Sequence, residues 1–344
     1  MHHHHHHGST NFKINPFKAV SFKESAIQKV MELGGVIAAV KYDGLRCHLV
    51  ITPTADIQGK PAARMVAISR TDKAIPALRE LFISAEHKIL LGQLLEESLY
   101  PEGLVIDGEV MVKGVDFNTG SGMLRRKEAI HVSKLAYKVY GVLPLNALKA
   151  SPDAEIEVPY CVMYEQVKVL MHQLWELLPE MDWKQEETYE VYDMASLEEL
   201  FKKVRAEGHE GLIIKDPMTN WKRGKKTGYW KMKPEGEIDG TVVGVNWGTV
   251  GLANEGKVIG FQVLLENGVV VDANGITQEQ MEEYTNSIKG YGQYHYCDQY
   301  TAEEAVFHGR PVQVKYMEKT PKGSLRHPSF QRWRDLEGAE GVKA

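Results

Sequence analysis

Hydrophobic residues in the first two thirds of the chain recur with two different spacings. Short apolar runs of strand length predict β-strands. They lie at residues 36–41, 45–51, 64–70, 104–113, 137–143, 187–194, 210–215 and 229–233. Between them, Met163, Val167, Leu170 and Leu174 share one face of a long amphipathic helix. Strands mixed with helices predict an α+β domain.

The pair Asp43-Gly44 separates the first two strand-like runs. Asp-Gly is a strong signal for a tight hairpin turn, so residues 36–41 and 45–51 are expected to pair with each other. This arrangement places Lys41 at the end of a strand, where its amine projects into a cleft.

After residue 236 the pattern becomes nearly all β. Strands are predicted at residues 240–247, 258–266, 269–273 and 311–318, and one helix at residues 277–289. Asn267-Gly268 predicts a hairpin turn between the second and third of these strands. Several short strands and one helix in this length favour a small Greek-key barrel of the OB-fold type. We therefore expect two domains, at residues 10–236 and 237–344.

Composition narrows the class of protein. The chain has 344 residues, of which residues 1–9 are a hexahistidine expression tag. Hydrophobic residues make up 43% and charged residues 25%, which is typical of a folded globular protein. No apolar run approaches the ~18 residues of a membrane span, and no secretory signal follows the tag. Three scattered cysteines fit a reducing compartment, so we expect a cytoplasmic protein.

Net charge is −5, which taken alone argues against a nucleic-acid partner. However, residues 222–233 hold six basic residues and no acidic one. A local cluster binds phosphate whatever the net charge, because the field within about a Debye length decides. Lys231 and Lys233 are two apart on a strand and so share a face, which suits a triphosphate. The glycine-interrupted loop before them is suited to a nucleic-acid backbone, although a solvated basic loop is the simpler alternative.

Three short motifs carry candidate chemistry. Lys41 would act as a nucleophile only when neutral, and neighbouring cations such as Lys231 and Lys233 favour the neutral amine. Glu109, in an apolar strand, needs a partner such as a ribose hydroxyl or a metal ion. Glu210 offers a carboxylate to Mg²⁺. Each motif alone is also compatible with a charged residue at the edge of a core strand.

The motifs occur in one order along the chain. They are Lys41-Tyr42-Asp43-Gly44, Ser69-Arg70, Asp107-Gly108-Glu109, Tyr140, Glu210-Gly211 and Lys231-Met232-Lys233, followed by the barrel. This series resembles the covalent nucleotidyltransferase superfamily of ATP-dependent ligases and capping enzymes. Residues 15–20, 112–122, 208–211, 251–261 and 323–330 are similar to the small DNA ligases of short-tailed (T-seven-like) phages. The resemblance covers residues 12–334.

The resemblance implies an N-terminal adenylation domain (nucleotidyltransferase, ATP-grasp-like) of packed antiparallel sheets and helices, followed by an OB-fold barrel. It implies an ATP-dependent DNA ligase that seals nicks through a lysyl-AMP and a DNA-adenylate, with Mg²⁺ or Mn²⁺. The expected partner is nicked double-stranded DNA, without a membrane, and the expected form is a monomer in the cytoplasm of an infected bacterial host.

The resemblance also implies residue roles. Lys41 becomes adenylated, Tyr140 stacks on adenine, and Glu109 holds the ribose and approaches the metal at Glu210. The implied nucleotide contacts are Val40, Lys41, Tyr42, Arg46, Arg70, Glu109, Tyr140, Lys225, Lys231 and Lys233. The implied nucleic-acid contacts are Lys222, Arg223, Lys226 and Arg326.

Two positions depart from the family pattern. The phage relatives carry a glutamate two residues before the nucleophile, where it recognises the adenine amino group, but this chain has Ala39. Adenine recognition would then fall to backbone groups near Val40. Larger ligases end in an Arg-x-Asp-Lys motif, and Arg326 is this chain's one candidate for that role.

Other functions share some of these motifs. A capping guanylyltransferase or an RNA ligase would use the same nucleophile with GTP or with nicked RNA. An NAD-dependent ligase is disfavoured by the chain length and by the absence of a cysteine cluster. A non-catalytic DNA-binding barrel would use aromatics such as Trp247 for stacking, although Trp247 is also compatible with a core position.

Overall fold

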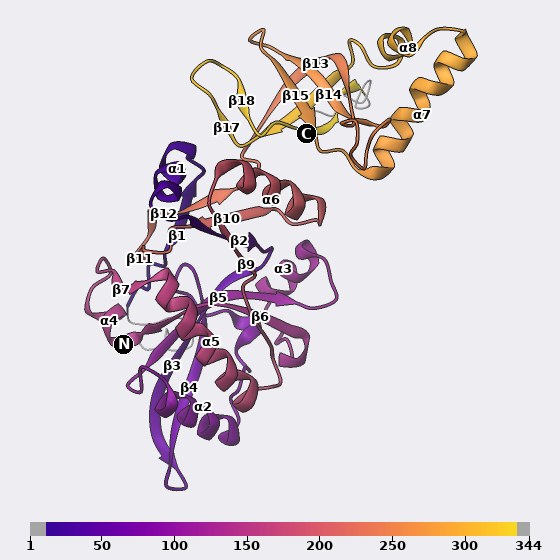
Figure 1. Ribbon diagram of the computed structural model, residues 1–344. Coiled ribbons are helices and arrows are strands. Elements are labelled where there is room, and N and C mark those ends of the chain that lie inside the picture. Colours follow the sequence, from indigo (N-terminus) through magenta and orange to yellow (C-terminus); the bar gives the residue numbers. More distant parts are fainter. Residues whose placement is uncertain (1–11, 336–344) are drawn as a thin grey trace. The chain divides into compact units, whose positions relative to one another are not determined.

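The computed structural model describes residues 12–335, so the predicted tag lies outside the described residues. The chain divides into two compact units (Figure 1). The first runs to Leu197 and includes Leu212–Lys231, and the second comprises Glu198–Gly211 and the chain from Met232 onward. Each unit is described below by itself.

Two five-stranded sheets form the framework of the first unit. In spatial order, the first sheet contains β1 (Lys18–Ser21), β12 (Lys225–Met232), β10 (Gly211–Lys215), β2 (Val36–Lys41) and β9 (Thr188–Val191). The second contains β4 (Lys60–Ser69), β3 (Leu45–Ile57), β5 (Leu104–Val112), β6 (Leu135–Pro144) and β8 (Asp182–Gln185). The predicted α+β class is confirmed. The sheets are mixed rather than antiparallel throughout, because β1 pairs with β12 and β6 with β8 in parallel.

The hairpin predicted at Asp43-Gly44 is wrong. β2 ends at Lys41 in the first sheet, and β3 begins at Leu45 in the second. β2 pairs instead with β9, and β3 pairs with β4 and β5. The short link therefore carries the chain from one sheet to the other. This crossing places Lys41 at the junction of the two sheets.

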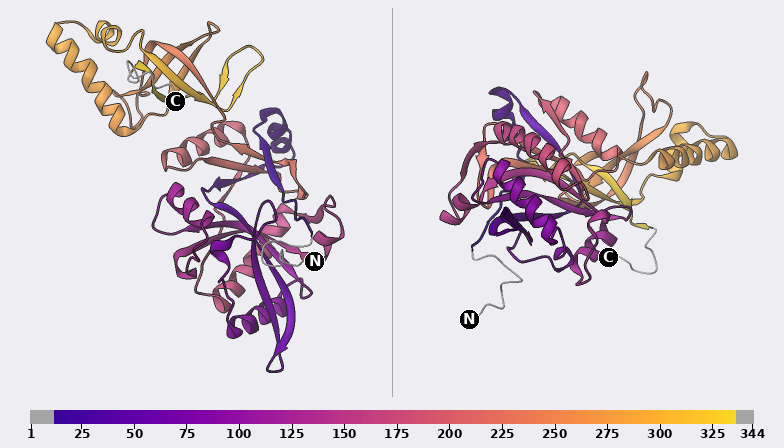
Figure 2. Two further views of the ribbon diagram at one scale, coloured as in Figure 1. Left: turned by 180° about the vertical axis from the view of Figure 1, so that it is seen from behind. Right: turned by 90° about the horizontal axis from the view of Figure 1, so that it is seen from below.

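Helices cover the second sheet. α2 (Ala85–Glu97) packs against β4, and α5 (Tyr160–Leu177) packs against β6 and α2 (Figure 2). The predicted apolar face of α5 is confirmed, because its regularly spaced apolar residues are all buried. The remaining elements of this part of the chain are α1 (Glu24–Glu32), α3 (Phe117–Arg125), α4 (Leu145–Ala150), α6 (Met194–Ala206), two 3₁₀ turns (Pro76–Leu78 and Val132–Lys134), and the strand pair β7 (Ile156–Pro159) and β11 (Asn220–Trp221).

The second unit contains the predicted barrel. Its closed order is β13 (Gly236–Trp247), β14 (Val258–Leu265), β15 (Val270–Asn274), β19 (Ser329–Trp333) and β16 (Pro311–Tyr316). The hairpin expected at Asn267-Gly268 is confirmed, since β14 and β15 pair antiparallel around it. Gly268 has φ +85°, a conformation that favours glycine. A small hairpin, β17 (Glu318–Lys319) with β18 (Leu325–Arg326), follows β16.

Two helices, rather than the one predicted, accompany the barrel. α7 (Gln278–His295) begins at a Thr277 capping box, and α8 (Gln299–Val306) packs against α7. α8 spans two turns and buries only Ala302, so its apolar pattern is too weak to detect. Inside the barrel, the rings of Phe261, Phe307 and Trp333 contact one another.

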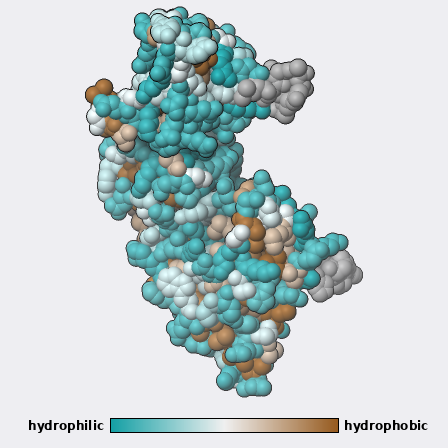
Figure 3. Space-filling model, turned by 90° about the vertical axis from the view of Figure 1, so that its right-hand side faces the viewer, coloured by the Kyte–Doolittle hydropathy of each residue, from teal (hydrophilic) through white to brown (hydrophobic). Residues whose placement is uncertain are grey.

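No helix among residues 12–335 is long and apolar enough to span a membrane. The face drawn in Figure 3 is largely hydrophilic, with hydrophobic side chains scattered over it.

Candidate active site

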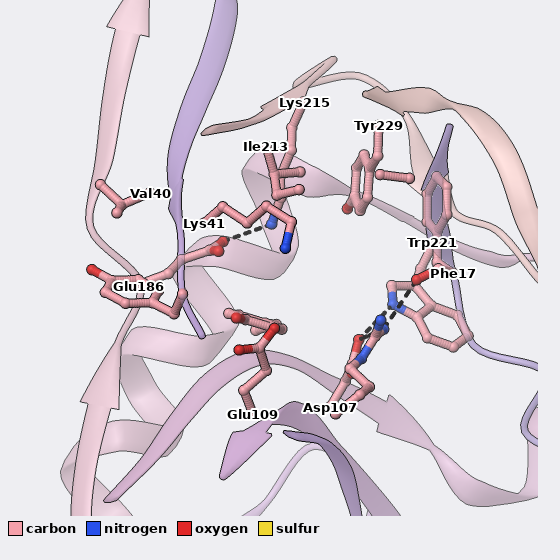
Figure 4. A pocket seen from close by; sticks show the side chains of 14 residues that line it. Phe17, Val40, Lys41, Asp107, Glu109, Glu186, Ile213, Lys215, Trp221 and Tyr229 are labelled. Atoms are coloured by element: carbon pink, nitrogen blue, oxygen red, sulfur yellow. Dashed lines mark hydrogen bonds and ion pairs between the residues drawn. The ribbon is translucent and has the colours of Figure 1, made fainter. Parts of the chain in front are cut away.

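A pocket lies between the two sheets of the first unit (Figure 4). The link from β2 into β3 supplies Val40, Lys41, Tyr42 and Arg46. The other lining residues are Phe17, Ala19, Asp107, Glu109, Tyr140, Glu186, Ile213, Lys215, Trp221 and Tyr229. The structure thus brings together six of the predicted nucleotide contacts: Val40, Lys41, Tyr42, Arg46, Glu109 and Tyr140.

Lys41 extends from the end of β2 into this pocket, and its amine points into the central space (Figure 4). Gly44 explains why the link is so compact. A Cβ at Gly44 would lie 2.8 Å from Glu109 Oε2, which is closer than real side-chain contacts allow. The glycine therefore lets the chain pass directly over the Glu109 carboxylate and sets the nucleophile candidate beside it.

Arg46 and Asp107 form an ion pair at one side of the pocket, in which Asp107 is buried and Arg46 is half-buried. Arg46 Nε and Nη2 donate to the two Asp107 oxygens at 2.7 and 3.0 Å, and Nη2 also donates to the Phe17 carbonyl at 3.0 Å. Trp221 Nε1 donates to Asp107 Oδ2 at 3.2 Å, and His48 Nε2 lies 3.0 Å from Oδ1. Burial alone would raise the pKa of Asp107, but the Arg46 charge and the His48 hydrogen bond hold it well below its usual range.

Glu109 is the second buried carboxylate of the pocket. Burial raises the pKa of Glu109, and the hydrogen bond from Tyr140 and the charges of Arg46 and Lys41 offset part of that rise. Glu109 Oε2 is buried and has no hydrogen-bond partner among the described residues. An unpaired buried acceptor is costly, so this oxygen is poised for a ligand hydroxyl or a cation.

Glu186 is the third carboxylate, and it pairs with Lys215. The distance from Lys215 Nζ to Glu186 Oε1 is 2.8 Å, and the two side chains are 6% and 4% exposed. The Tyr160 hydroxyl donates to the same oxygen. Lys215 Nζ also lies 5.4 Å from the ring centre of Tyr140 and 5.0 Å from that of Tyr229, within the range of cation–π attraction.

Tyr42 packs beside the nucleophile candidate, and Lys138 Nζ lies 3.1 Å from the centre of its ring. Burial and the Glu187 charge raise the pKa of Tyr42 to about 12. Burial and the Lys184 charge lower the pKa of Lys138 to about 8. Lys138 does not line the pocket, which leaves Lys41 and Lys215 as its two lining lysines.

Other predicted nucleotide and metal contacts do not line this pocket. Arg70 and Lys225 are exposed, and Lys231 is half-buried. Glu210 and Lys233 pair with each other at 3.3 Å within the second unit. Among residues 12–335, no cluster of three or more His, Cys, Asp or Glu side chains could hold a metal ion.

The structure contradicts the nucleic-acid role predicted for Arg223. Its residue exposure is 2%, and its guanidinium donates to the backbone carbonyls of Lys13, Ile14, Leu148, Ser151 and Ala154. Its donors are therefore committed to distant parts of its own chain. By contrast Lys226 is exposed, and half-buried Lys222 donates to the Thr227 carbonyl at 2.8 Å.

Two predicted residues lie in the barrel unit. Arg326 Nε pairs with Glu318 Oε1 at 2.7 Å, across the β17–β18 hairpin. Trp247 packs against the hydrophobic core of the barrel, and its indole N–H donates to Glu303. Trp247 is thus partly buried against this core rather than a member of it, and the choice between a core and a stacking role stays a prediction.

Sequence reasoning quoted Asp107 within a motif but assigned it no role, and it considered Lys215, at the end of the strand 210–215, only as a lysine that could reach a phosphate. It missed Glu186, which stands in the polar stretch 184–188 and has no motif around it. Its only available signal is its place just before a predicted strand.

Comparison with known proteins identifies the class. The family profile described as "ATP dependent DNA ligase domain" matches residues 16–233, and that described as "DNA ligase C-terminal domain" matches residues 234–334. The chain therefore belongs to the ATP-dependent DNA ligase family, and it is an ATP-dependent DNA ligase.

Within that family it is similar to phage enzymes. It is 43% identical to the DNA ligase of Escherichia phage T7, over 95% of this chain and 98% of the relative. It is also 43% identical to the DNA ligase of Enterobacteria phage T3, over 95% and 97%. The solved structure of the bacteriophage T7 ATP-dependent DNA ligase in complex with ATP superposes with a TM-score of 0.81, covering 94% of this chain and all of that one.

Proposed function

We propose that Lys41 is the nucleophile that carries AMP in the sealing of DNA nicks. The observation that carries this proposal is the convergence of the Lys41 amine with Glu109, Arg46 and Tyr140 in one pocket between the sheets. An amine, a buried acceptor and an aromatic ring are the groups needed to bind a nucleoside triphosphate and attack its α-phosphate.

The reaction then runs through three phosphoryl transfers. Lys41 Nζ attacks the α-phosphorus of ATP, a P–N bond forms, and pyrophosphate leaves with the electrons of the broken P–O bond. A 5′-phosphate oxygen at the nick attacks the same phosphorus and releases the Lys41 amine. Finally the 3′-hydroxyl attacks the activated 5′-phosphorus, loses its proton and expels AMP.

The lining residues suggest how the nucleotide is held. Tyr140 on β6 and Ile213 on β10 belong to opposite sheets, which suits a flat base between them. Glu109 Oε2 is available to a ribose hydroxyl. Arg46 Nη1 makes no hydrogen bond within residues 12–335, so it is available to the ribose or a phosphate. Backbone groups of Val40 and Tyr42 complete this set.

For the triphosphate tail we propose four basic residues outside the pocket lining: Arg70, Lys225, Lys231 and Lys233. Cations that follow the phosphates stabilise the charge that builds up during phosphoryl transfer. Arg326 is a further candidate, and its ion pair with Glu318 must open for it to contact a nucleotide or DNA.

The donor set fits Mg²⁺ or Mn²⁺. The orphaned Glu109 Oε2 is a hard oxygen ligand, and Glu210 offers a second carboxylate. Magnesium in nucleotide enzymes is held by one or two carboxylates together with substrate phosphates, so a dedicated cluster of side chains is not required. When bound, the ion neutralises phosphate charge.

We further propose that the enzyme acts as a monomer on nicked duplex DNA in the cytoplasm of an infected bacterium. The names and phage source of the two similar DNA ligases support the DNA substrate and the host compartment. A boundary at residue 236, between an adenylation domain and an OB-fold domain, is supported by the change of profile match near residue 234.

The test uses the whole chain and labelled nucleotides. We expect α-labelled ATP with Mg²⁺ to give a covalent AMP adduct that EDTA prevents and added Mg²⁺ or Mn²⁺ restores. Adduct freed of ATP should then seal nicked DNA stoichiometrically. Labelling by GTP but not ATP would indicate a capping enzyme instead, and preference for nicked RNA would indicate an RNA ligase.

The basic loop predicts a salt effect on nick binding. Replacing Lys222 and Lys226 by alanine should flatten the plot of log K against log salt by about 0.9 for each DNA phosphate that the protein then leaves unneutralised. Affinities are measured on one nicked duplex over a range of salt concentrations. Lys60→Ala, at the exposed first position of β4, is the matched control and should leave the slope unchanged. If the protein with alanine at Lys222 and Lys226 keeps the parental slope, as the Lys60→Ala control does, the loop does not follow the DNA backbone.

A further inference from the structure

The three carboxylates of the pocket differ in how completely their oxygens are used. Asp107 accepts from Arg46 and Trp221 on both oxygens. Glu109 is bonded by Tyr140 and has a buried, unpaired Oε2 beside Gly44. Glu186 is used on one side only, because Lys215 and the Tyr160 hydroxyl both donate to Oε1.

Glu186 Oε2 is an acceptor without a hydrogen-bond partner among the described residues. It accepts no hydrogen bond from residues 12–335, although the side chain is 4% exposed. The residue lines the pocket, and Figure 4 shows its carboxylate turned toward the space that the Lys41 amine enters. A nearly buried carboxylate oxygen in such a place favours a ligand that brings a hydrogen-bond donor.

The backbone brings the segment that follows Glu186 alongside the residues that precede the nucleophile. Val40 N donates to the Glu187 carbonyl at 3.1 Å, and Ala39 pairs with Thr188 across β2 and β9. Ala39 is itself buried and brings no polar side-chain atom. A donor on the edge of a base bound in the pocket could therefore meet Glu186, which lies in the link between β8 and β9.

The chemistry of purines then gives the carboxylate a role in selection. Adenine carries an amino group at C6, which donates, whereas guanine and hypoxanthine carry a carbonyl oxygen there, which accepts. An ionised carboxylate can only accept hydrogen bonds. It therefore attracts the amino group of adenine and repels the carbonyl oxygen of guanine or hypoxanthine. Lys215, which can only donate, occupies Oε1 and leaves Oε2 for the base.

We propose that Glu186 selects adenine, by accepting a hydrogen bond from the 6-amino group of ATP at Oε2. This inference rests on the proposed use of the pocket for nucleotide transfer to Lys41. Glu186 acts on specificity and takes no part in bond making. Lys215 and Tyr160 are positioning residues that hold its carboxylate.

The first test needs only the unaltered enzyme. The rate of adduct formation at limiting nucleotide is compared for ATP, ITP and purine riboside triphosphate, which lacks the amino group. We expect ATP to be favoured over each by about 10- to 100-fold, the range of a hydrogen bond to a charged group. If purine riboside triphosphate serves as well as ATP, the pocket has no acceptor for the amino group and the proposal is wrong.

The second test reverses the hydrogen-bonding character of the site. In Glu186→Gln the amide oxygen must face Lys215 and Tyr160, which donate, so the amide NH₂ takes the place of Oε2. We expect the ATP-to-ITP ratio to fall by about tenfold or more, mainly through KM. Glu187→Gln neutralises the neighbouring exposed carboxylate, which does not line the pocket, and is the matched control, with its ratio expected to stay at the parental value.

The outcomes separate this inference from the function on which it rests. If no nucleotide forms an adduct with the unaltered enzyme, the proposed function itself fails. If adducts form but Glu186→Gln keeps the parental ratio, or Glu187→Gln changes it equally, Glu186 does not select the base.

Discussion

Lys41→Ala will form no AMP adduct, and its fold will be unchanged. The side chain stands at the end of β2 with its amine in the pocket, so its removal takes away the attacking nitrogen without opening the core. Loss of a nucleophile costs at least about a thousandfold in rate. A substitution at such a position changes the free energy of unfolding by about 0.5 kcal/mol. The measurements are α-labelled ATP incorporation and thermal unfolding.

Two further variants make this result specific. Lys41→Arg keeps the positive charge, but a guanidinium does not lose its proton at working pH, so it should be equally inactive. Lys226→Ala removes an exposed lysine and should label normally.

Peptide mapping then checks the site of attachment. Lys215 also lines the pocket, but its amine is paired with Glu186. An adduct on Lys215, or one that persists in Lys41→Ala, would overturn the assignment of the nucleophile.

The active-site motif was predictable from sequence, while its surroundings depend on contacts between distant segments. Lys41 and Glu109 each stand in a short pattern with recognisable chemistry, and the role of Tyr140 was implied by the family resemblance. All three line one pocket. The hairpin at Asp43-Gly44 was not predicted correctly, because turn chemistry is local and sheet pairing is not. Gly44 instead allows the backbone to approach Glu109 closely. Rules for local turn sequences do not predict a contact between residues so far apart in the chain.

Helix α2 of the first unit was not predicted from the sequence, and it contains a glycine. α2 has Gly92 at its centre, and a Cβ there would lie 2.2 Å from the Pro61 carbonyl oxygen. The residue allows the helix to lie directly on the chain near β4, at the expense of helix propensity. A tertiary contact thus selected a residue that weakens the sequence signal for the element containing it.

Arg223, in a basic segment, is another residue whose role depends on tertiary contacts that the sequence does not reveal. Its neighbours Lys222, Lys225 and Lys226 share its charge, and sequence alone assigns all of them to phosphate. The structure separates them by burial, because the Arg223 guanidinium is the donor for carbonyls from residues 13–14 and 148–154. Burial lowers the pKa of this guanidinium, and the charges of Asp153 and Asp72 oppose that change.

We therefore expect Arg223→Ala to lower stability rather than DNA affinity. Removing the side chain leaves several carbonyl oxygens without their donor, at a cost of about 1–3 kcal/mol for each group that water does not reach. We expect a total loss of about 3 kcal/mol. It corresponds to a fall in melting temperature of about 6–12 °C for a unit of this size. Urea and thermal unfolding followed by tryptophan fluorescence measure it.

An exposed lysine of the same loop provides the control. Lys226→Ala, three residues away and exposed, should leave the melting temperature unchanged and reduce the salt dependence of nick binding. Arg223→Ala, assayed well below its melting temperature, should keep the parental salt slope. The opposite pair of results, with a stable Arg223→Ala protein and a flattened slope, would mean that the guanidinium leaves its carbonyl partners to contact DNA. The contrast follows from desolvation, since a cation committed to carbonyls inside the protein must give up those bonds before it can replace a counterion on the phosphate backbone.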